Sequence, residues 1–197
     1  MKILSASNNL HKVEEIKYAL NDLHDIKIIS LSYFGIKTNV NENGDTLEKN
    51  ALKKAKETYD ILKIPAISDD TGLFTIALKG EPGVRSARYS GENASDSENC
   101  NKLLINLREI SEENRKAYFE TVICFYINEN NIQYFNGICN GKIDFVKKGE
   151  NGFGYDPVFI PDGFEKSFAE MTNAEKNEIS HRAKAMTKFK EYIKLII

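Results

Sequence analysis

Apolar residues recur along this chain with two different spacings, which predict strands alternating with helices in the first half. Short apolar runs predict buried strands over residues 2–6, 26–31 and 66–70, the last of which ends in two acids. Apolar residues three and four positions apart predict helices within residues 7–23 and over residues 46–62 and 96–110. Elements that alternate in this way are typical of an α/β fold.

The second half of the chain predicts longer strands. Stretches rich in β-branched and aromatic residues predict strands over residues 117–127 and 132–146, with the polar residues between them as a hairpin turn. A glycine-containing loop leads to a short strand at residues 158–160, and a final helix carries an apolar stripe from Ile179 to Ile196. We expect one domain over residues 1–197, with a mixed β-sheet and flanking helices in two lobes that share a core.

Composition and charge exclude several function classes. The 197 residues carry a formal net charge of −2, which disfavours a broad surface for nucleic acid. No apolar run approaches the length of a membrane span, and the first residues lack the pattern of a signal peptide. The three cysteines show no CxxC spacing and are typical of reduced thiols. We therefore expect a cytoplasmic protein that binds neither nucleic acid nor membrane.

The stretch "SNNLHK" at residues 7–12 opens the first predicted helix. The beginning of a helix exposes unpaired backbone N–H groups and positive potential, which suit phosphate oxygens. Ser7, Asn8 and Asn9 have side chains that cap a helix or donate hydrogen bonds, and Lys12 adds a charge. Taken alone, the stretch favours an ordinary N-cap followed by a solvated lysine.

Two adjacent acids, Asp69 and Asp70, end the third predicted strand. Ligands of α/β folds bind at this edge of the sheet, although a simple turn at Thr71 would also explain the pattern. Neighbouring side chains of an extended segment point to opposite faces, so the two carboxylates need not act together. Glu42 in an earlier loop is a candidate second ligand for Mg²⁺, which prefers one or two carboxylates with water and phosphate oxygens.

The loop "GENGFGYDP" and the segment "EKNEISHRAKAM" contain groups that suit a nucleobase. Phe153, Tyr155 and Asp156 offer stacking and hydrogen bonding, although aromatic residues of a glycine turn can equally anchor it to the core. Its glycine spacing does not match a dinucleotide-binding fingerprint. Lys176 and His181 would point about 140° apart on one straight helix, so a shared ligand requires the helix to restart, for example at Ser180. A solvated charged face is the alternative.

The order of these stretches resembles the inosine triphosphate pyrophosphatase family. The resemblance runs through "SNNLHK", "NGDTLEKNALKKA", "SDDTGL", "GEPGVRSARYSG", "NGFGYDPVFIP", "FAEM" and "KNEISHRAKAM". It implies an elongated mixed sheet whose two lobes surround a central nucleotide-binding cleft, usually in a homodimer. It also implies Mg²⁺-dependent hydrolysis of ITP, dITP and XTP to the monophosphate and diphosphate.

The resemblance also implies a role for each matching position. Asp70 is the general base, and the metal ligands are Glu42, Asp69 and Asp70. Asn8 stands where the family usually has glycine. The substrate-binding positions are Ser7, Asn8, Asn9, Leu10, His11, Lys12, Lys54, Thr71, Phe153, Gly154, Tyr155, Asp156, Lys176, His181 and Arg182.

These assignments predict water attack at the α-phosphorus, with His181 and Arg182 donating to the 6-oxo group of the purine. Two alternatives stay open at this point. One is a pyrophosphatase for another modified nucleotide, such as a modified pyrimidine or a methylated base. The other is a nucleotide-binding protein without turnover, which the acids and lysines at the predicted site argue against.

Overall fold

The computed structural model describes residues 1–7, 9–36 and 40–197. Asn8, predicted to bind phosphate, lies outside this part of the chain. The helices are α1 (Leu10–Ala19), α2 (Leu47–Leu62), α3 (Asp96–Asn106), α4 (Asn173–Ile179) and α5 (His181–Ile196). The strands are β1 (Lys2–Ser5), β2 (Lys27–Ser30), β3 (Ala66–Thr75), β4 (Pro82–Gly83), β5 (Lys116–Asn128), β6 (Asn131–Ile143) and β7 (Phe159–Pro161).

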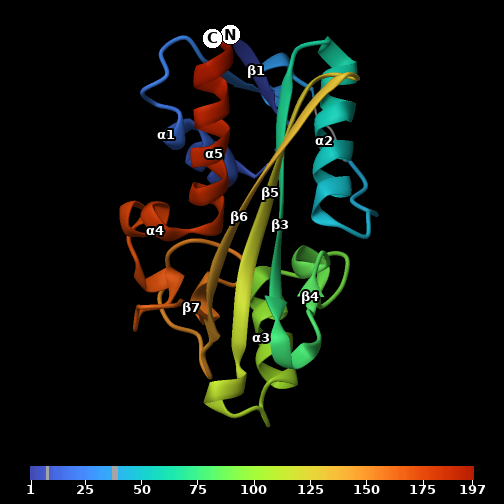
Figure 1. The fold of residues 1–197 in the computed structure, drawn as a ribbon. Helices are drawn as coiled ribbons and strands as arrows, with labels where there is room; N and C mark the ends of the chain where they lie inside the picture. Colours follow the sequence, from blue (N-terminus) through green and yellow to red (C-terminus); the bar gives the residue numbers. More distant parts are fainter. Residues whose placement is uncertain (8, 37–39) are drawn as a thin grey trace. The chain divides into compact units, whose positions relative to one another are not determined.

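The strands form one mixed sheet in the order β2-β1-β3-β5-β6-β7, with β4 paired to β3 (Figure 1). Strand β1 lies parallel to β2 and β3, so that Leu4 stands opposite Ile29 on one side and Ala66 on the other. Strands β4 and β7 run antiparallel to β3 and β6 respectively. The prediction of an α/β fold with a mixed sheet and flanking helices is confirmed.

The chain divides into two compact units, each made of segments distant in sequence. Unit 1 comprises residues 1–70, 121–137 and 182–197, and unit 2 comprises residues 71–120 and 138–181. The chain passes from unit 1 to unit 2 between Asp70 and Thr71, and back to unit 1 between His181 and Arg182. Several predicted site residues therefore stand at the points where the chain changes unit.

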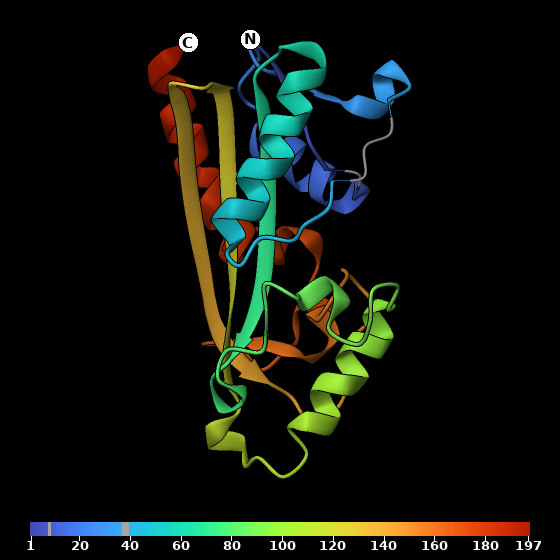
Figure 2. The ribbon, with the colours of Figure 1, turned by 90° about the vertical axis from the view of Figure 1, so that its right-hand side faces the viewer.

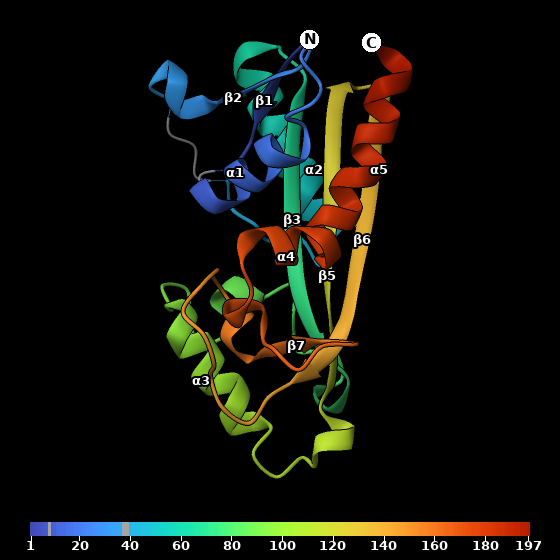
Figure 3. The same ribbon diagram turned by 90° about the vertical axis from the view of Figure 1, so that its left-hand side faces the viewer.

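Unit 1 has helices on both faces of its strands. Helix α2 covers one face, and helices α1 and α5 cover the other (Figures 2 and 3). The core under α1 and α5 contains apolar residues of β1, β3 and β5, including Ile3, Ile67 and Phe125, packed against Phe189. On the α2 side, Ala51 and Ala55 pack against β5. Both chain termini lie at the same end of this unit (Figure 1).

The predicted helices and hairpin are observed, with three differences in extent. Strand β3 continues through the two acids to Thr75 instead of ending at residue 70. Gly72 lies inside this strand, where a Cβ would be 2.7 Å from the carbonyl oxygen of Gly83 on the neighbouring strand β4, so the close approach of β4 requires glycine. Helix α3 ends at Asn106, and the final helix is broken at Ser180. Within the described residues, no helix is long and apolar enough to cross a membrane.

Arg115 is buried in unit 2 and ties three segments of this unit together. Its guanidinium donates hydrogen bonds to the carbonyl oxygens of Leu107 (2.6 Å), Ile143 (2.8 Å) and Asp144 (2.8 Å). Only 1% of the residue is exposed. These bonds join the carbonyl just after α3, which also accepts from the N–H of Ile110, to the two carbonyls at the end of β6.

Replacing Arg115 with Met is expected to lower the free energy of unfolding by about 3 kcal/mol, because buried carbonyls left without donors cost about 1–3 kcal/mol each. Urea denaturation of both proteins measures this difference. Arg108→Met is the matched control, since its side chain is 73% exposed and surface changes usually stay within about 0.5 kcal/mol. Equal unfolding midpoints for the two variants would contradict the prediction.

Candidate active site

Helix α1 begins with a side-chain cap directly after β1. The Asn9 Oδ1 atom accepts a hydrogen bond from the backbone N–H of Lys12 at 3.4 Å, and Ser7 Oγ accepts one from the N–H of Asn9 at 3.2 Å. Leu10 and His11 form the first turn of the helix. The capping predicted for this stretch is therefore observed. The backbone of the first turn is the part of the stretch that suits an anion.

The two acids of β3 point to opposite faces of the strand, as the extended backbone requires. Lys12 of α1 reaches Asp69, with 2.8 Å between Nζ and Oδ2. Lys54 of α2 reaches Asp70, with 2.9 Å between Nζ and Oδ1. Parallel pairing with β1 ends at Ile67, so both acids lie just beyond the carboxyl end of β1, where α/β folds bind ligands.

Asp69 lies among cations. Its Oδ2 atom is 3.0 Å from Arg182 Nη2, in addition to the contact with Lys12, and Arg182 Nη1 is 2.5 Å from Glu15 Oε2. Burial would raise the pKa of Asp69, but Lys12 and Arg182 outweigh it and hold this pKa well below its usual range. Asp69 is therefore a carboxylate at every ordinary pH and keeps Lys12 and Arg182 in place.

Asp70 lies in the opposite electrostatic environment. Burial raises the pKa of its carboxyl group, Lys54 opposes this effect, and the nearby Glu42 adds to it, so the pKa lies above its ordinary value. Lys54 is itself buried, and its pKa is raised because Asp70, Asp69 and Glu42 outweigh the effect of burial. Adjacent carboxyl groups whose pKa values move in opposite directions are typical of acid–base sites.

Two of the three predicted metal ligands come together around one cation. Lys54 Nζ lies 2.9 Å from Glu42 Oε1 and 2.9 Å from Asp70 Oδ1, so both carboxylates can share one positive charge. Asp69 faces the other side of the strand and binds Lys12 and Arg182. Among the described residues, no group of three or more His, Cys, Asp or Glu side chains is placed to hold a metal ion. Two carboxylates still suit Mg²⁺, which keeps several waters and phosphate oxygens as ligands.

A second cluster of predicted residues forms within unit 2. Asp156 Oδ2 accepts hydrogen bonds from Lys176 Nζ at 2.6 Å and from the backbone N–H of Phe153 at 2.9 Å. Lys176 Nζ also lies 4.8 Å from the centre of the Phe153 ring. Gly152 permits this turn because its φ is +77° and a Cβ would lie 2.0 Å from Asp156 Oδ2. The loop thus presents an aromatic ring beside a buried ion pair.

Tyr155 is not available for stacking, although the sequence offered it as a candidate together with Phe153. It is only 4% exposed, packs in the core of unit 2, and donates its hydroxyl to the carbonyl of Ser86 at 2.8 Å. The alternative of an aromatic anchor therefore describes Tyr155. Phe153 is half-buried and remains the aromatic side chain of this loop that can meet a base.

The last two helices separate Lys176 from His181 and Arg182. Ser180 has an extended backbone (φ −67°, ψ 156°) between α4 and α5, so the restart required by the sequence argument is observed. His181 belongs to unit 2 and stacks on Phe119, with 4.5 Å between ring centres. Arg182 belongs to unit 1 and binds Asp69. Thr71 is half-buried in β3 of unit 2.

Two residues that contact the site were missed by the sequence argument. Asn50 donates a hydrogen bond from Nδ2 to Asp70 Oδ2 at 3.1 Å, and Glu15 binds Arg182 as described above. Asn50 precedes Lys54 by four positions and Glu15 follows Lys12 by three, so each shares a helix face with a predicted lysine. That spacing is a sequence signal that points to both residues, and Asn50 also lies in the stretch "NGDTLEKNALKKA".

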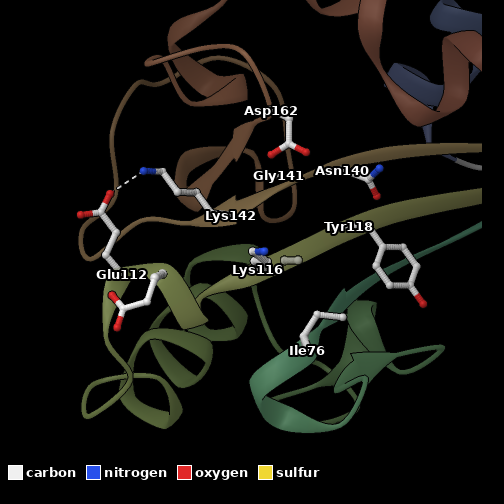
Figure 4. A pocket seen from close by; sticks show the side chains of 10 residues that line it. Ile76, Glu112, Lys116, Tyr118, Asn140, Gly141, Lys142 and Asp162 are labelled. Atoms are coloured by element: carbon white, nitrogen blue, oxygen red, sulfur yellow. Dashed lines mark hydrogen bonds and ion pairs between the residues drawn. The ribbon is translucent and has the colours of Figure 1, made fainter.

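A surface pocket of about 710 Å³ lies elsewhere in unit 2. Figure 4 shows the ion pair between Lys142 and Glu112 at one side, with Tyr118 and Ile76 at another. None of the residues that line this pocket belongs to the predicted site. The two clusters above, and not this pocket, bring the predicted chemistry together.

Comparisons with known proteins agree on one family. The model of the Ham1 family matches residues 3–192. A dITP/XTP pyrophosphatase of Thermoanaerobacter pseudethanolicus is 48% identical over 98% of this chain and 96% of its own. The solved structure of the Staphylococcus aureus Ham1 protein is 36% identical, with a TM-score of 0.89 over 100% of both chains. A HAM1 protein from Coxiella burnetii is 37% identical, with a TM-score of 0.90 over 98% of both.

Proposed function

Because this chain belongs to the Ham1 family, we propose that it is a nucleoside triphosphate pyrophosphatase that removes deaminated purines from the nucleotide pool. Its substrates are ITP, dITP and XTP, and the reaction of each with water gives the monophosphate and diphosphate. The similarity to relatives that are dITP/XTP pyrophosphatases supports the proposal. The observation that carries it is the pair of adjacent buried acids, Asp69 and Asp70, whose pKa values are moved in opposite directions beside two lysines.

Asp70 is the general base of the proposed reaction. A raised pKa brings a carboxylate closer to the operating pH, which makes it a better acceptor for a proton from water. Asp70 accepts that proton as the water oxygen attacks the α-phosphorus, and diphosphate leaves. Lys54 and Asn50 hold the carboxylate in place, so it can orient the water before attack.

The phosphates are bound by the first turn of α1 together with Lys12 and Lys54. Backbone N–H groups and two ammonium groups offset the negative charge of phosphate oxygens. Glu42 and Asp70 would hold Mg²⁺, which when bound neutralises charge that develops on the phosphates. Asp69, which the sequence also offered as a ligand, instead positions Lys12 through the ion pair at 2.8 Å.

The residues proposed to recognise the base are Phe153 and Lys176. Phe153 offers a ring face for stacking, and Lys176 is a donor that cannot accept a hydrogen bond. A 6-oxo purine presents an acceptor and an N1–H donor, whereas adenine presents the reverse. A donor aimed at the 6-position therefore favours hypoxanthine and xanthine. The contacts of His181 and Arg182 with the base stay predictions, as does the residue that excludes the 2-amino group of guanine.

A substrate panel tests the proposed function. We expect release of diphosphate from ITP and XTP with Mg²⁺, and a value of kcat/KM several hundredfold lower for ATP, because each of two mispaired polar groups costs about 1–3 kcal/mol. Modified pyrimidine triphosphates serve as the comparison for ring size. Preference for ATP, GTP or a pyrimidine would overturn the proposal, and binding without diphosphate release would identify a non-catalytic protein.

The remaining expectations concern assembly and location. The family resemblance supports a homodimer, a single domain over residues 1–197 and a cytoplasmic protein. The family model matches residues 3–192, a range that includes segments of both units, and this supports the proposal of one domain. Sedimentation of the purified protein at several concentrations measures the oligomeric state.

A further inference from the structure

Asn50 connects the carboxylate of Asp70 to the loop that carries Glu42, the other carboxylate that binds Lys54. It lies on α2 one turn before Lys54 and is fully buried, with 0% of the residue exposed. Its side chain bonds to Asp70 on one side and to the loop that carries Glu42 on the other: Oδ1 accepts a hydrogen bond from the backbone N–H of Gly44 at 2.8 Å. Gly44 is only two positions from Glu42.

The orientation of this amide follows from its partners. The N–H of Gly44 can only donate, so the amide oxygen of Asn50 must face it and the NH₂ group must face Asp70. Lys54 donates to Oδ1 of Asp70 and Asn50 donates to Oδ2. Because each oxygen of the carboxylate is held by a different side chain of α2, rotation of the Asp70 carboxylate is restricted.

The loop approaches the Asn50 amide closely at Gly44. A Cβ on Gly44 would lie 2.6 Å from Asn50 Oδ1, so the loop can approach the amide only because residue 44 has no side chain. One buried side chain thereby fixes the loop of Glu42 relative to the strand of Asp70.

We infer that Asn50 is a positioning residue, which sets the carboxylates of Asp70 and Glu42 for a shared divalent cation and for the attacking water. This inference rests on the proposed function but predicts an effect on metal binding that is independent of turnover. Partners that orient metal-binding carboxylates typically contribute about 10–100-fold to affinity or activity. Leucine has nearly the same size but can neither donate to Asp70 nor accept from Gly44.

Asn99 offers a matched control in a different part of the protein. It is also a buried helix residue, with 2% exposed. Its amide holds a loop in the same manner, accepting from the N–H of Ser90 at 2.8 Å and donating to the carbonyl of Ala87 at 3.1 Å. Asn99→Leu therefore removes two comparable buried hydrogen bonds and touches no residue of the proposed catalytic site.

The experiment compares wild type, Asn50→Leu and Asn99→Leu by three measurements. These are the unfolding midpoint, the affinity for Mn²⁺ alone from electron paramagnetic resonance, and kcat and KM for ITP. We expect similar losses of stability in both variants. Only Asn50→Leu should bind Mn²⁺ about 10–100-fold more weakly and lose about 10–100-fold in kcat, with a smaller change in KM because the effect acts on the chemical step.

Equal Mn²⁺ affinity and equal kcat in the two variants would overturn the inference and leave Asn50 as a structural residue. If Asn50→Leu does not fold, Gly44→Ala provides the test, because its methyl group displaces the Asn50 oxygen and leaves both carboxylates present. Folded Gly44→Ala protein with unchanged Mn²⁺ affinity and kcat would also overturn it. If wild type releases no diphosphate, the proposed function fails, and the Mn²⁺ measurement still decides the role of Asn50.

Discussion

Replacing Asp70 with Asn is expected to lower kcat for ITP by about 10²–10⁴-fold, the usual scale for loss of a general base. The amide has nearly the same shape as the carboxylate but cannot accept a proton from water. The Asp70 carboxylate also shares the ammonium group of Lys54 with Glu42. The change therefore removes a proposed metal ligand as well. Steady-state release of diphosphate measures the loss.

The matched control for this change is Asp60→Asn. Asp60 also binds two lysines, with 2.6 Å to Lys56 and 2.6 Å to Lys63, but it lies on the surface of α2. Turnover by Asp60→Asn should equal that of wild type. Near-normal turnover by Asp70→Asn would show that another group accepts the proton.

The pH dependence of the reaction follows from the raised pKa of Asp70. Activity requires the carboxylate, so kcat/KM is expected to fall as the pH drops through this pKa, which lies above the ordinary value of 3.8. The sign for stability is the opposite of the usual one for an acid. The folded protein binds the proton more tightly than the unfolded chain, so the contribution of Asp70 to stability decreases as the pH rises through its folded pKa.

Replacing Asp69 with Asn is expected to lower the free energy of unfolding by about 3–5 kcal/mol, the usual cost of breaking a buried ion pair. Arg182 is 2% exposed and would keep a buried charge that no longer has Asp69 beside it, although its ion pair with Glu15 stays. The lowered pKa of Asp69 also means that its ionised form stabilises the folded protein. This contribution to the free energy of unfolding is present above pH 3.8 and is lost as the pH falls through the pKa of Asp69 in the folded protein. Urea denaturation near neutral pH measures the change.

Asp22→Asn is the control for this loss of stability. Asp22 binds Lys190 at 2.5 Å, but its side chain is 52% exposed, and exposed ion pairs contribute about 0–1 kcal/mol. A loss of stability in Asp69→Asn no larger than in Asp22→Asn would contradict the prediction. The two neighbouring acids should thus give different phenotypes: Asp70→Asn mainly lowers kcat, and Asp69→Asn mainly lowers the free energy of unfolding.

The sequence predicted most elements because their signals are local. Thr46 caps α2 by accepting a hydrogen bond from the N–H of Lys49 at 3.2 Å, and Thr172 and Glu175 form a capping box at the start of α4. The same local rules predicted the opposite faces of Asp69 and Asp70. Alternation along an extended segment is a property of the backbone and needs no knowledge of the neighbouring elements.

The missed features depend on partners that are distant in sequence. The residues Thr71 and Gly72 look like a turn, yet β4 approaches them and extends the strand, and only the structure shows why Gly72 is small. From the sequence, Tyr155 could stack on a base. In the structure its hydroxyl donates a hydrogen bond to the carbonyl oxygen of Ser86, and its ring is buried. The ion pair of Arg182 with Asp69, 113 positions away, was likewise not predicted, because no local pattern indicates it.

The ammonium of Lys54 between Glu42 and Asp70 has a consequence for the resting enzyme. Two carboxylates so close together in a partly buried setting would repel each other, and many small metalloproteins unfold when the ion that separates such groups is withdrawn. Here the chain carries its own counter-ion, attached to a helix that is capped and packed independently of any ligand. Under the proposed Mg²⁺-assisted reaction, removal of divalent ions is therefore expected to stop turnover without unfolding the protein.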